Sequence, residues 1–163
     1  MSPRYDVPNA APEPLRQVQL LVNSADVEHG VDWLPDWLAE RGLAGEEARG
    51  RELREALREL VLANNGFAVS PEALAVVNAA ADRVRLRVDG GVQLETQDAL
   101  DGVVAIVLGA MLDGTWVRLK ACRNCHWSFY DYSPNRSATW CSMQLCGNRA
   151  KTRAYRKRKT ATR

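Results

Sequence analysis

The residues with the clearest chemistry are four cysteines that lie close together near the C-terminus. Cys122 and Cys125 form a C-x2-C pair, and after fifteen intervening residues Cys141 and Cys146 form a second pair. Two pairs at this separation are typical of zinc ribbons and treble-clef modules, in which thiolates hold Zn²⁺ tetrahedrally. Four thiolates leave no open position for water, so we expect one structural Zn²⁺ that supplies folding energy to a small module.

Other uses of the same cysteines stay open at this point. An iron–sulfur cluster or a redox pair would need the same residue type. Cys122, Cys125 and His126 also match the C-x-x-C-H pattern of covalent haem attachment, but the second cysteine pair would then have no role. Haem attachment generally requires export, and we expect no signal peptide because the first residues lack an apolar segment. We interpret His126 as a packing residue instead.

The second chemical feature is a run of cations after the last cysteine. Eight Lys or Arg and no acid lie between Arg149 and Arg163. On a helix, Arg149, Arg153 and Arg156 would share one face with Lys157. A basic helix held by a zinc module can contact several backbone phosphates at once, so we expect binding to nucleic acid. A solvated tail is the alternative, and the lack of an apolar face argues against a membrane surface.

The expected nucleic-acid interface extends from the cysteine segment into this tail. Its candidate residues are Lys120, Arg123, Arg136, Asn148, Arg149, Lys151, Arg153, Arg156, Lys157, Arg158 and Lys159. Phe129 and Tyr130 are candidates for stacking on unpaired bases. Trp33 and Trp37 lie one helical turn apart, a spacing that is more typical of a core than of a ligand pocket.

Charge divides the 163-residue chain into two parts. Residues 1–117 hold 10 Lys/Arg against 19 Asp/Glu, whereas residues 118–163 hold 12 Lys/Arg against a single acid, Asp131. The near-neutral net charge of +2 therefore conceals an acidic part of −9 and a basic part of +11. The composition, 46% apolar and 26% charged, is that of a globular protein and excludes collagenous and wholly disordered classes.

Helical patterns in the acidic part predict the scaffold for these groups. Ser70, Pro71 and Glu72 supply a capping hydroxyl, a first-turn proline and a first-turn acid, and Gly66 is a suitable end for the preceding helix. We expect helices over residues 15–23, 33–38, 45–66, 70–82 and 97–112.

After residue 82, apolar residues recur at every second position instead of at helical spacing, and this change predicts one small hairpin. Apolar and polar residues alternate over 84–88 and 92–95, and Asp89-Gly90-Gly91 between them suits a tight turn. We expect the apolar helix at 97–112 to cover the apolar face of this hairpin. Residues 116–122 look like a short strand that leads into the cysteines.

Three regions follow from these patterns. Residues 1–14 hold four prolines and no apolar segment, so we expect a disordered leader. Residues 15–114 form an acidic, mainly helical domain, and residues 115–163 form a four-cysteine zinc module with a basic C-terminal helix. The fold class is thus mainly α with a small β-hairpin.

No stretch approaches the roughly 20 apolar residues of a membrane span, and we expect a cytoplasmic protein.

The cysteine segment resembles a known family. The series Cys122-x2-Cys125, Trp140-Cys141-Ser142 and Cys146-Gly147-Asn148-Arg149 is similar to the bacterial CGNR-type zinc finger. Upstream residues 20–23, 37–38 and 53–57 resemble the helical ABATE domain that usually precedes this finger. The resemblance implies a stress-related transcription regulator or an RNA-binding zinc ribbon, with Cys122, Cys125, Cys141 and Cys146 as zinc ligands. The loop at 132–139 carries fewer cations than is usual in the family.

These observations favour a regulator that binds DNA through the finger and basic helix, with the helical domain sensing a small-molecule effector or forming a homodimer. An RNA-binding protein with the same basic surface is the alternative. A protein-binding module and an enzyme are weaker alternatives. The sequence contains no Ser/His/Asp set, phosphate-binding glycine loop or open metal site, although Asp131 lies beside an aromatic pair.

Overall fold

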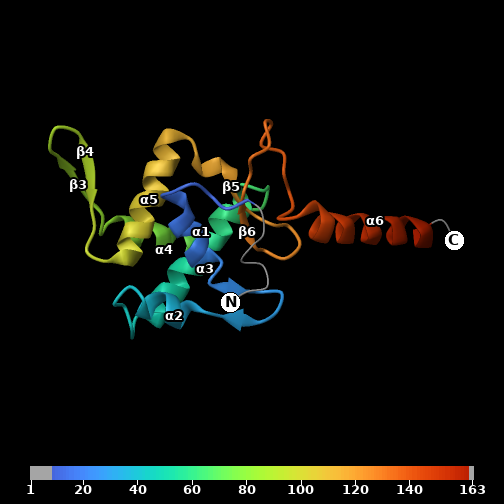
Figure 1. Cartoon of the computed structure of the whole chain (residues 1–163), viewed down its shortest axis with the longest axis horizontal. Coiled ribbons are helices and arrows are strands. Elements are labelled where there is room, and N and C mark those ends of the chain that lie inside the picture. The colour runs from blue at the N-terminus through green and yellow to red at the C-terminus, as the bar shows by residue number, and fades with distance from the viewer. Residues whose placement is uncertain (1–8, 162–163) are drawn as a thin grey trace.

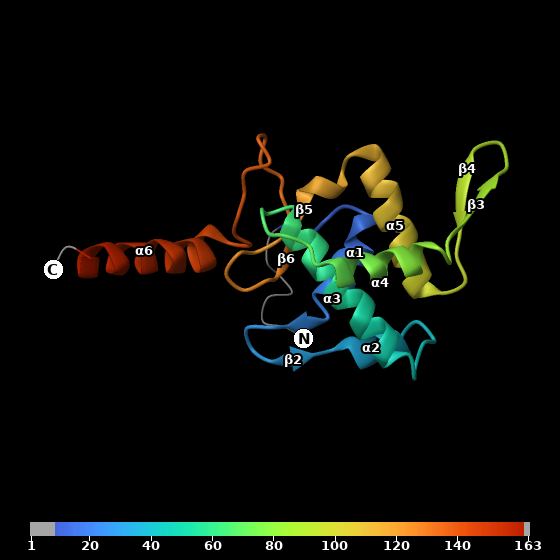
Figure 2. The ribbon, with the colours of Figure 1, turned by 180° about the vertical axis from the view of Figure 1, so that it is seen from behind.

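A computed structural model of the chain describes residues 9–161 and confirms the mainly helical fold class. Helices and short hairpins form a rounded body, from which a hairpin projects at one end and a long helix at the other (Figures 1 and 2). The helices are α1 (Leu15–Val22), α2 (Leu34–Ala39), α3 (Glu47–Ala63), α4 (Pro71–Ala81), α5 (Ala99–Asp113) and α6 (Asn148–Ala161). The antiparallel hairpins are β1 (Ala25–Asp26) with β2 (Val31–Asp32), β3 (Arg85–Val88) with β4 (Val92–Glu95), and β5 (Leu119–Ala121) with β6 (Ser128–Tyr130).

Local capping explains where the helices begin and end. The Ser70 hydroxyl accepts a hydrogen bond from the Ala73 amide at 3.1 Å, as the sequence predicts for the start of α4. Asp98 caps α5 in the same way, accepting from the Leu100 and Asp101 amides. Gly66 follows α3 with φ +91°, a conformation that a residue with a Cβ rarely adopts.

The β3–β4 hairpin has the predicted register, but its surroundings differ from the prediction. Leu86 pairs with Leu94 and Val88 with Val92, so these four side chains share one face. The expectation that α5 covers this face is wrong for most of it, because Leu86, Val88 and Val92 are 66%, 73% and 69% exposed. Leu94, which is half-buried, lines a hollow together with residues of α5.

One core spans the helical domain and the start of the C-terminal module. Fully buried Leu21, Leu57 and Val104 belong to it, and Leu119 and Tyr130 of the β5–β6 hairpin join the same cluster. A second, smaller cluster surrounds the four cysteines with Trp127 and Phe129. The helical domain and the hairpin of the zinc module therefore pack as one body.

Buried amide side chains attach β6 to the helical domain. The Asn23 carbonyl oxygen accepts from the Ser128 amide at 2.7 Å, and the Asn23 NH₂ group donates to the Ser128 carbonyl at 2.9 Å. Asn23 thus makes the pair of bonds that a neighbouring strand would make. Gln19 adds a second donor to the same carbonyl at 3.0 Å, and Arg58 donates to the carbonyl of His126.

Residues 9–14 also lie against this hairpin. The Tyr130 amide donates to the Asn9 carbonyl at 2.8 Å, and Ala11 is buried. Of the leader expected over 1–14, residues 1–8 lie outside the described part, and among residues 9–14 Asn9 is half-buried, Ala11 is buried and the other four are exposed. Among the described residues, no helix has the length and apolar character that crossing a bilayer would take.

We predict that replacing Asn23 with Ala lowers the free energy of unfolding by about 1–3 kcal/mol, because the buried Ser128 amide loses its partner. Asn78→Ala is the matched control, since Asn78 is an exposed residue of α4. We expect this control to stay within about 0.5 kcal/mol of the wild type. Urea unfolding of the zinc-loaded proteins measures both, and equal stability of the two variants would contradict this role of Asn23.

Candidate metal centre and nucleic-acid interface

The turn between β5 and β6 and the residues before α6 bring the four cysteines together. Cys122 and Cys125 lie on that turn, and Cys141 and Cys146 lie before and within a π-helical turn at Met143–Gly147. All four side chains are buried, and their sulfur atoms lie within 4.8 Å of one another. The sequence-predicted ligand set is thus assembled at one point.

The distances between the sulfurs fit a tetrahedral metal shell. The Sγ atoms of Cys125 and Cys141 are 3.6 Å apart, those of Cys141 and Cys146 are 3.7 Å apart, and those of Cys125 and Cys146 are 3.6 Å apart. With Zn–S bonds of about 2.3 Å, the edge of a tetrahedron is about 3.8 Å. A disulfide would need sulfurs about 2.05 Å apart, so these distances match a shared cation and not a covalent pair.

The cysteine thiols are also close enough to affect one another's protonation. Hydrogen bonds with the Cys125 and Cys141 thiols hold the pKa of the Cys122 thiol far below its ordinary value. Sharing of protons with Cys122 raises the pKa of Cys125 to about 12 and raises that of Cys141 as well. Without a metal, one thiolate suppresses the ionisation of its neighbours. A divalent cation would bind the cysteines as thiolates, with release of their protons.

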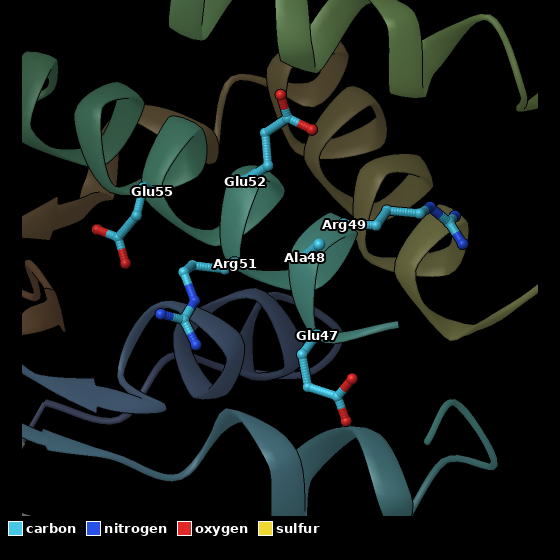
Figure 3. A pocket seen from close by; sticks show the side chains of 6 residues that line it. All are labelled: Glu47, Ala48, Arg49, Arg51, Glu52 and Glu55. Carbon is cyan, nitrogen blue, oxygen red and sulfur yellow. The ribbon is translucent and has the colours of Figure 1, made fainter. Parts of the chain in front are cut away.

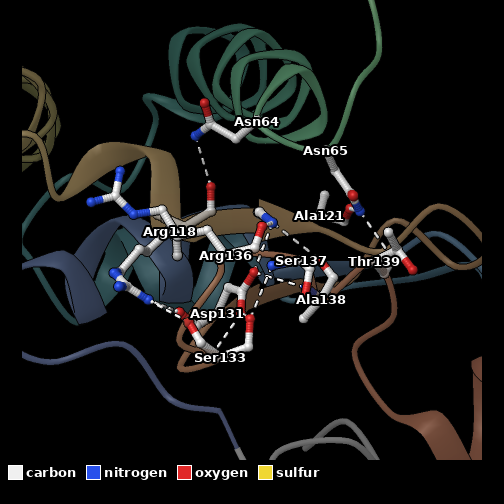
Figure 4. Close-up of polar contacts among 12 residues, drawn as sticks. Asn64, Asn65, Arg118, Ala121, Asp131, Ser133, Arg136, Ser137, Ala138 and Thr139 are labelled. Atoms are coloured by element: carbon white, nitrogen blue, oxygen red, sulfur yellow. Dashed lines mark hydrogen bonds and ion pairs between the residues drawn. The ribbon is translucent and has the colours of Figure 1, made fainter.

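A buried ion pair shapes the loop between the two cysteine pairs (Figure 4). The Lys120 ammonium donates to a carboxylate oxygen of Asp131 at 2.7 Å and to the carbonyls of Arg136 and Ala138. The other Asp131 oxygen accepts from the amide and hydroxyl of Ser133. Burial alone would raise the pKa of Asp131, but the bonds from Lys120 and Ser133 outweigh burial and hold it below its ordinary value.

These contacts change the role that the sequence suggests for two residues. Lys120, a candidate for nucleic-acid contact, is only 5% exposed and its ammonium is bonded inside the loop. It has no surface to offer a phosphate in this structure. Asp131, considered as a catalytic carboxylate, is fully buried and holds the loop in shape.

The remaining candidate cations lie at the surface. Arg123 is exposed, and its Nε donates to the carbonyl of Asn65 at the end of α3. Arg136 is exposed on the loop between the cysteine pairs. The helix α6 carries the others, and the side chains at 148, 149, 151, 153 and 156–159 are all exposed. Figures 1 and 2 show that α6, the helix that carries most of these cations, projects from the body.

Two contacts fix the base of α6. The Arg149 guanidinium donates to Glu28 in the β1–β2 turn at 2.5 Å. The Arg153 guanidinium donates to the side-chain carbonyl of Asn124, whose NH₂ group in turn donates to the Cys146 sulfur at 3.4 Å. Asn124 thus connects the basic helix directly to a metal ligand. Sequence reasoning missed Glu28 and Asn124, since neither residue belongs to the motif that carries the chemistry.

The aromatic candidates for base stacking are not at the surface. Phe129 is 1% exposed and Tyr130 is 7% exposed, because both pack into the cores on either side of β6. That interpretation of the sequence is wrong for the described conformation. The tyrosines that lie exposed in this region are Tyr132 and Tyr155. Trp37 is buried as expected for a core residue, with the Arg41 guanidinium 4.0 Å from its ring centre.

A hollow of about 740 Å³ along α3 does not have the features of a ligand site (Figure 3). Its charged side chains point in different directions, and most are already paired. Arg49 binds Asp98 at 2.7 Å and Asp101 at 2.6 Å on α5 and its cap. Glu55 binds Arg54 and Arg58. A binding pocket would instead aim a few polar groups at one point.

We predict one zinc ion per chain by elemental analysis. Removing it with a chelator should speed amide hydrogen exchange in the loop at 132–147 and in α6, because the cysteine cluster holds these segments to the body. Exchange in α3 should change far less, since α3 packs in the other core. Cys141→Ser should reproduce this pattern without a chelator. Absence of zinc, or exchange that rises equally in α3 and α6, would contradict this account.

Comparison with known families finds a match to each of two parts of the chain. The profile of the CGNR zinc finger matches residues 118–159. The profile of the ABATE family, described as "Putative stress-induced transcription regulator", matches residues 16–113. No curated protein matches the chain. The CGNR family implies one structural zinc at the four-cysteine cluster, and neither family is an enzyme family. The chain therefore belongs to the ABATE family and carries a C-terminal CGNR zinc finger.

Proposed function

We propose that this zinc-binding regulator acts on transcription by binding DNA through α6 and the surface of its zinc finger. The observation that carries the proposal is the projection of α6 away from the body with its cations exposed. A helix that lies on its own domain could present only part of its charge. A projecting helix can bring several cations to neighbouring phosphates at once.

The dimensions of α6 suit the major groove of duplex DNA. Its 14 residues span about 21 Å at about 1.5 Å per residue. The major groove of B-form DNA is about 12 Å wide and admits an α-helix. The major groove of A-form RNA is deep and narrow, so a double-stranded RNA would accept this helix less readily. The shape of the groove thus favours binding to DNA, whereas the charge of α6 alone would favour binding to DNA and RNA alike.

The zinc finger supplies the orientation of α6 in this proposal. The bonds from Arg149 to Glu28 and from Arg153 to Asn124 hold the first turns of the helix. The cations beyond Arg153, at 156–159, then lie farthest from the body. We propose Arg123, Arg136 and the cations of α6 as the nucleic-acid interface, without Lys120.

We further propose that the helical domain regulates nucleic-acid binding, either by forming a homodimer or by responding to a small-molecule effector. We also propose that the protein acts in the cytoplasm and does not catalyse a reaction. The bonds that occupy Asp131 support a structural role for the one carboxylate of the finger.

A salt titration tests this function. If about five cations meet phosphates, log K should fall against log salt with a slope of about −4 to −5 on duplex DNA. The double variant Arg156→Ala/Lys157→Ala should make the slope less negative by about 2, because each lost phosphate contact reduces the magnitude of the slope by about 1. Arg51→Ala, which removes an exposed cation of α3, is the matched control and should leave the slope unchanged. A slope insensitive to the double variant would place the interface elsewhere.

Competition separates DNA from RNA. Labelled duplex DNA bound to the full zinc-loaded chain is challenged with unlabelled duplex DNA or with structured RNA of equal length. We expect the DNA to compete at least about tenfold better, since the groove of RNA excludes the helix. Better competition by RNA would favour the alternative function, an RNA-binding zinc ribbon that uses the same surface.

A further inference from the structure

The turn between β1 and β2 places an acid of the helical domain beside the base of α6. The Glu28 carboxylate accepts a hydrogen bond from the Arg149 guanidinium at 2.5 Å, although the two residues are 121 positions apart in the chain. Figures 1 and 2 show the β1–β2 hairpin and the start of α6 at the same end of the body. An acid of the helical domain thus occupies a cation that the proposed function assigns to nucleic acid.

Glu28 is positioned by its own turn. The buried Asp26 carboxylate accepts from the backbone amides of Glu28 and His29 at 3.1 and 3.2 Å. Its second oxygen lies 2.8 Å from Nδ1 of the His29 ring. An aspartate that bonds the backbone amides of the next residues fixes a turn locally. The backbone of Glu28 therefore keeps its place whether or not its carboxylate is bonded to Arg149.

The pair of Glu28 and Arg149 is exposed enough to be exchanged. The side chains of Arg149 and Glu28 are 52% and 26% exposed. An ion pair near the solvent contributes little to stability, and salt screens it. A carboxylate and a phosphate use the same N–H donors of a guanidinium group, so they compete for it. A phosphate group that approaches α6 can thus displace the carboxylate of Glu28.

The surroundings of Arg149 suit a chain of phosphates. Arg149, Arg153 and Arg156 line one hollow of about 420 Å³ on α6, together with Thr152. Phosphates of a strand that follows this hollow would pass all three guanidinium groups. When Arg149 changes its partner, the base of α6 is still held by the bond from Arg153 to Asn124 and by the cysteine cluster.

We propose that Glu28 competes with backbone phosphates for Arg149 and thereby weakens the binding of nucleic acid, as an autoinhibitory contact between the acidic domain and the basic finger. The contact joins the part of the chain with a net charge of −9 to the part with a net charge of +11. The inference rests on the proposed function, and it names one means by which the helical domain restrains that site. Nucleic acid engages Arg149 only when this carboxylate is displaced, so the free protein loses part of the affinity that α6 could supply.

Binding of duplex DNA to the full zinc-loaded chain, measured by fluorescence anisotropy at several salt concentrations, tests the proposal. Glu28→Gln removes the charge and keeps the size of the side chain, while the bonds of Asp26 still hold the turn. We expect this variant to bind about two- to fivefold more tightly at low salt. The slope of log K against log salt should become more negative by about 1, because one more phosphate is contacted. Glu52→Gln is the matched control, since it removes the same charge from an exposed position of α3, and it should leave the slope unchanged.

A second variant, Arg149→Gln, separates this contact from a general effect of charge. In that background the further change Glu28→Gln should alter neither the affinity nor the slope, because the guanidinium for which the two anions compete is gone. The proposal is overturned if Glu28→Gln strengthens binding as much without Arg149 as with it. It is also overturned if Glu28→Gln weakens binding or leaves it unchanged while the wild type binds DNA. Failure of the wild type and of all variants to bind DNA or structured RNA would instead overturn the proposed function, and this inference with it.

Discussion

Four buried cysteine sulfurs within 4.8 Å of one another form the constraint on which the C-terminal part depends. The distances of 3.6–3.7 Å between these sulfurs match the edge of a tetrahedron around Zn²⁺. The turn after β5 and the segment that contains the π-helical turn carry these sulfurs, and Asn124 links Arg153 of α6 to the Cys146 sulfur. The direction in which α6 leaves the body is consequently set by metal coordination.

The second determinant of the structure is the way in which the zinc finger packs against the helical domain. The β5–β6 hairpin shares the main core through Leu119 and Tyr130, and Asn23 replaces a missing strand beside Ser128. Buried amides and guanidinium groups at such an interface must keep their partners, because an unpaired polar group there costs about 1–3 kcal/mol. The acidic domain and the basic finger are therefore held in a fixed arrangement.

Local signals in the sequence predict much of the fold and the metal site. The capping sequence at Ser70, the glycine at 66 and the alternation around Asp89-Gly90-Gly91 act within a few residues, and each has the predicted consequence. The cysteine spacing is sufficient for the metal cluster. Residues such as Lys120 and Phe129 show why the rest could not be predicted. They pair across β5 and β6. Lys120 is buried by the loop that contains Asp131 and Arg136, and Phe129 packs in the cysteine cluster, so the burial of both depends on residues that lie farther along the chain. The two-residue strands β1 and β2 are too short to give a periodic signal.

The central claim is that α6, oriented by the zinc cluster, is the surface that meets DNA. Amide NMR spectra of the zinc-loaded chain during titration with duplex DNA test this claim most directly, since they report every segment at once. The account predicts that the largest shift changes fall in α6 and in the exposed loop around Arg136, with smaller changes in α3 and in the β3–β4 hairpin. Changes concentrated in the helical domain, with α6 unaffected, would contradict it.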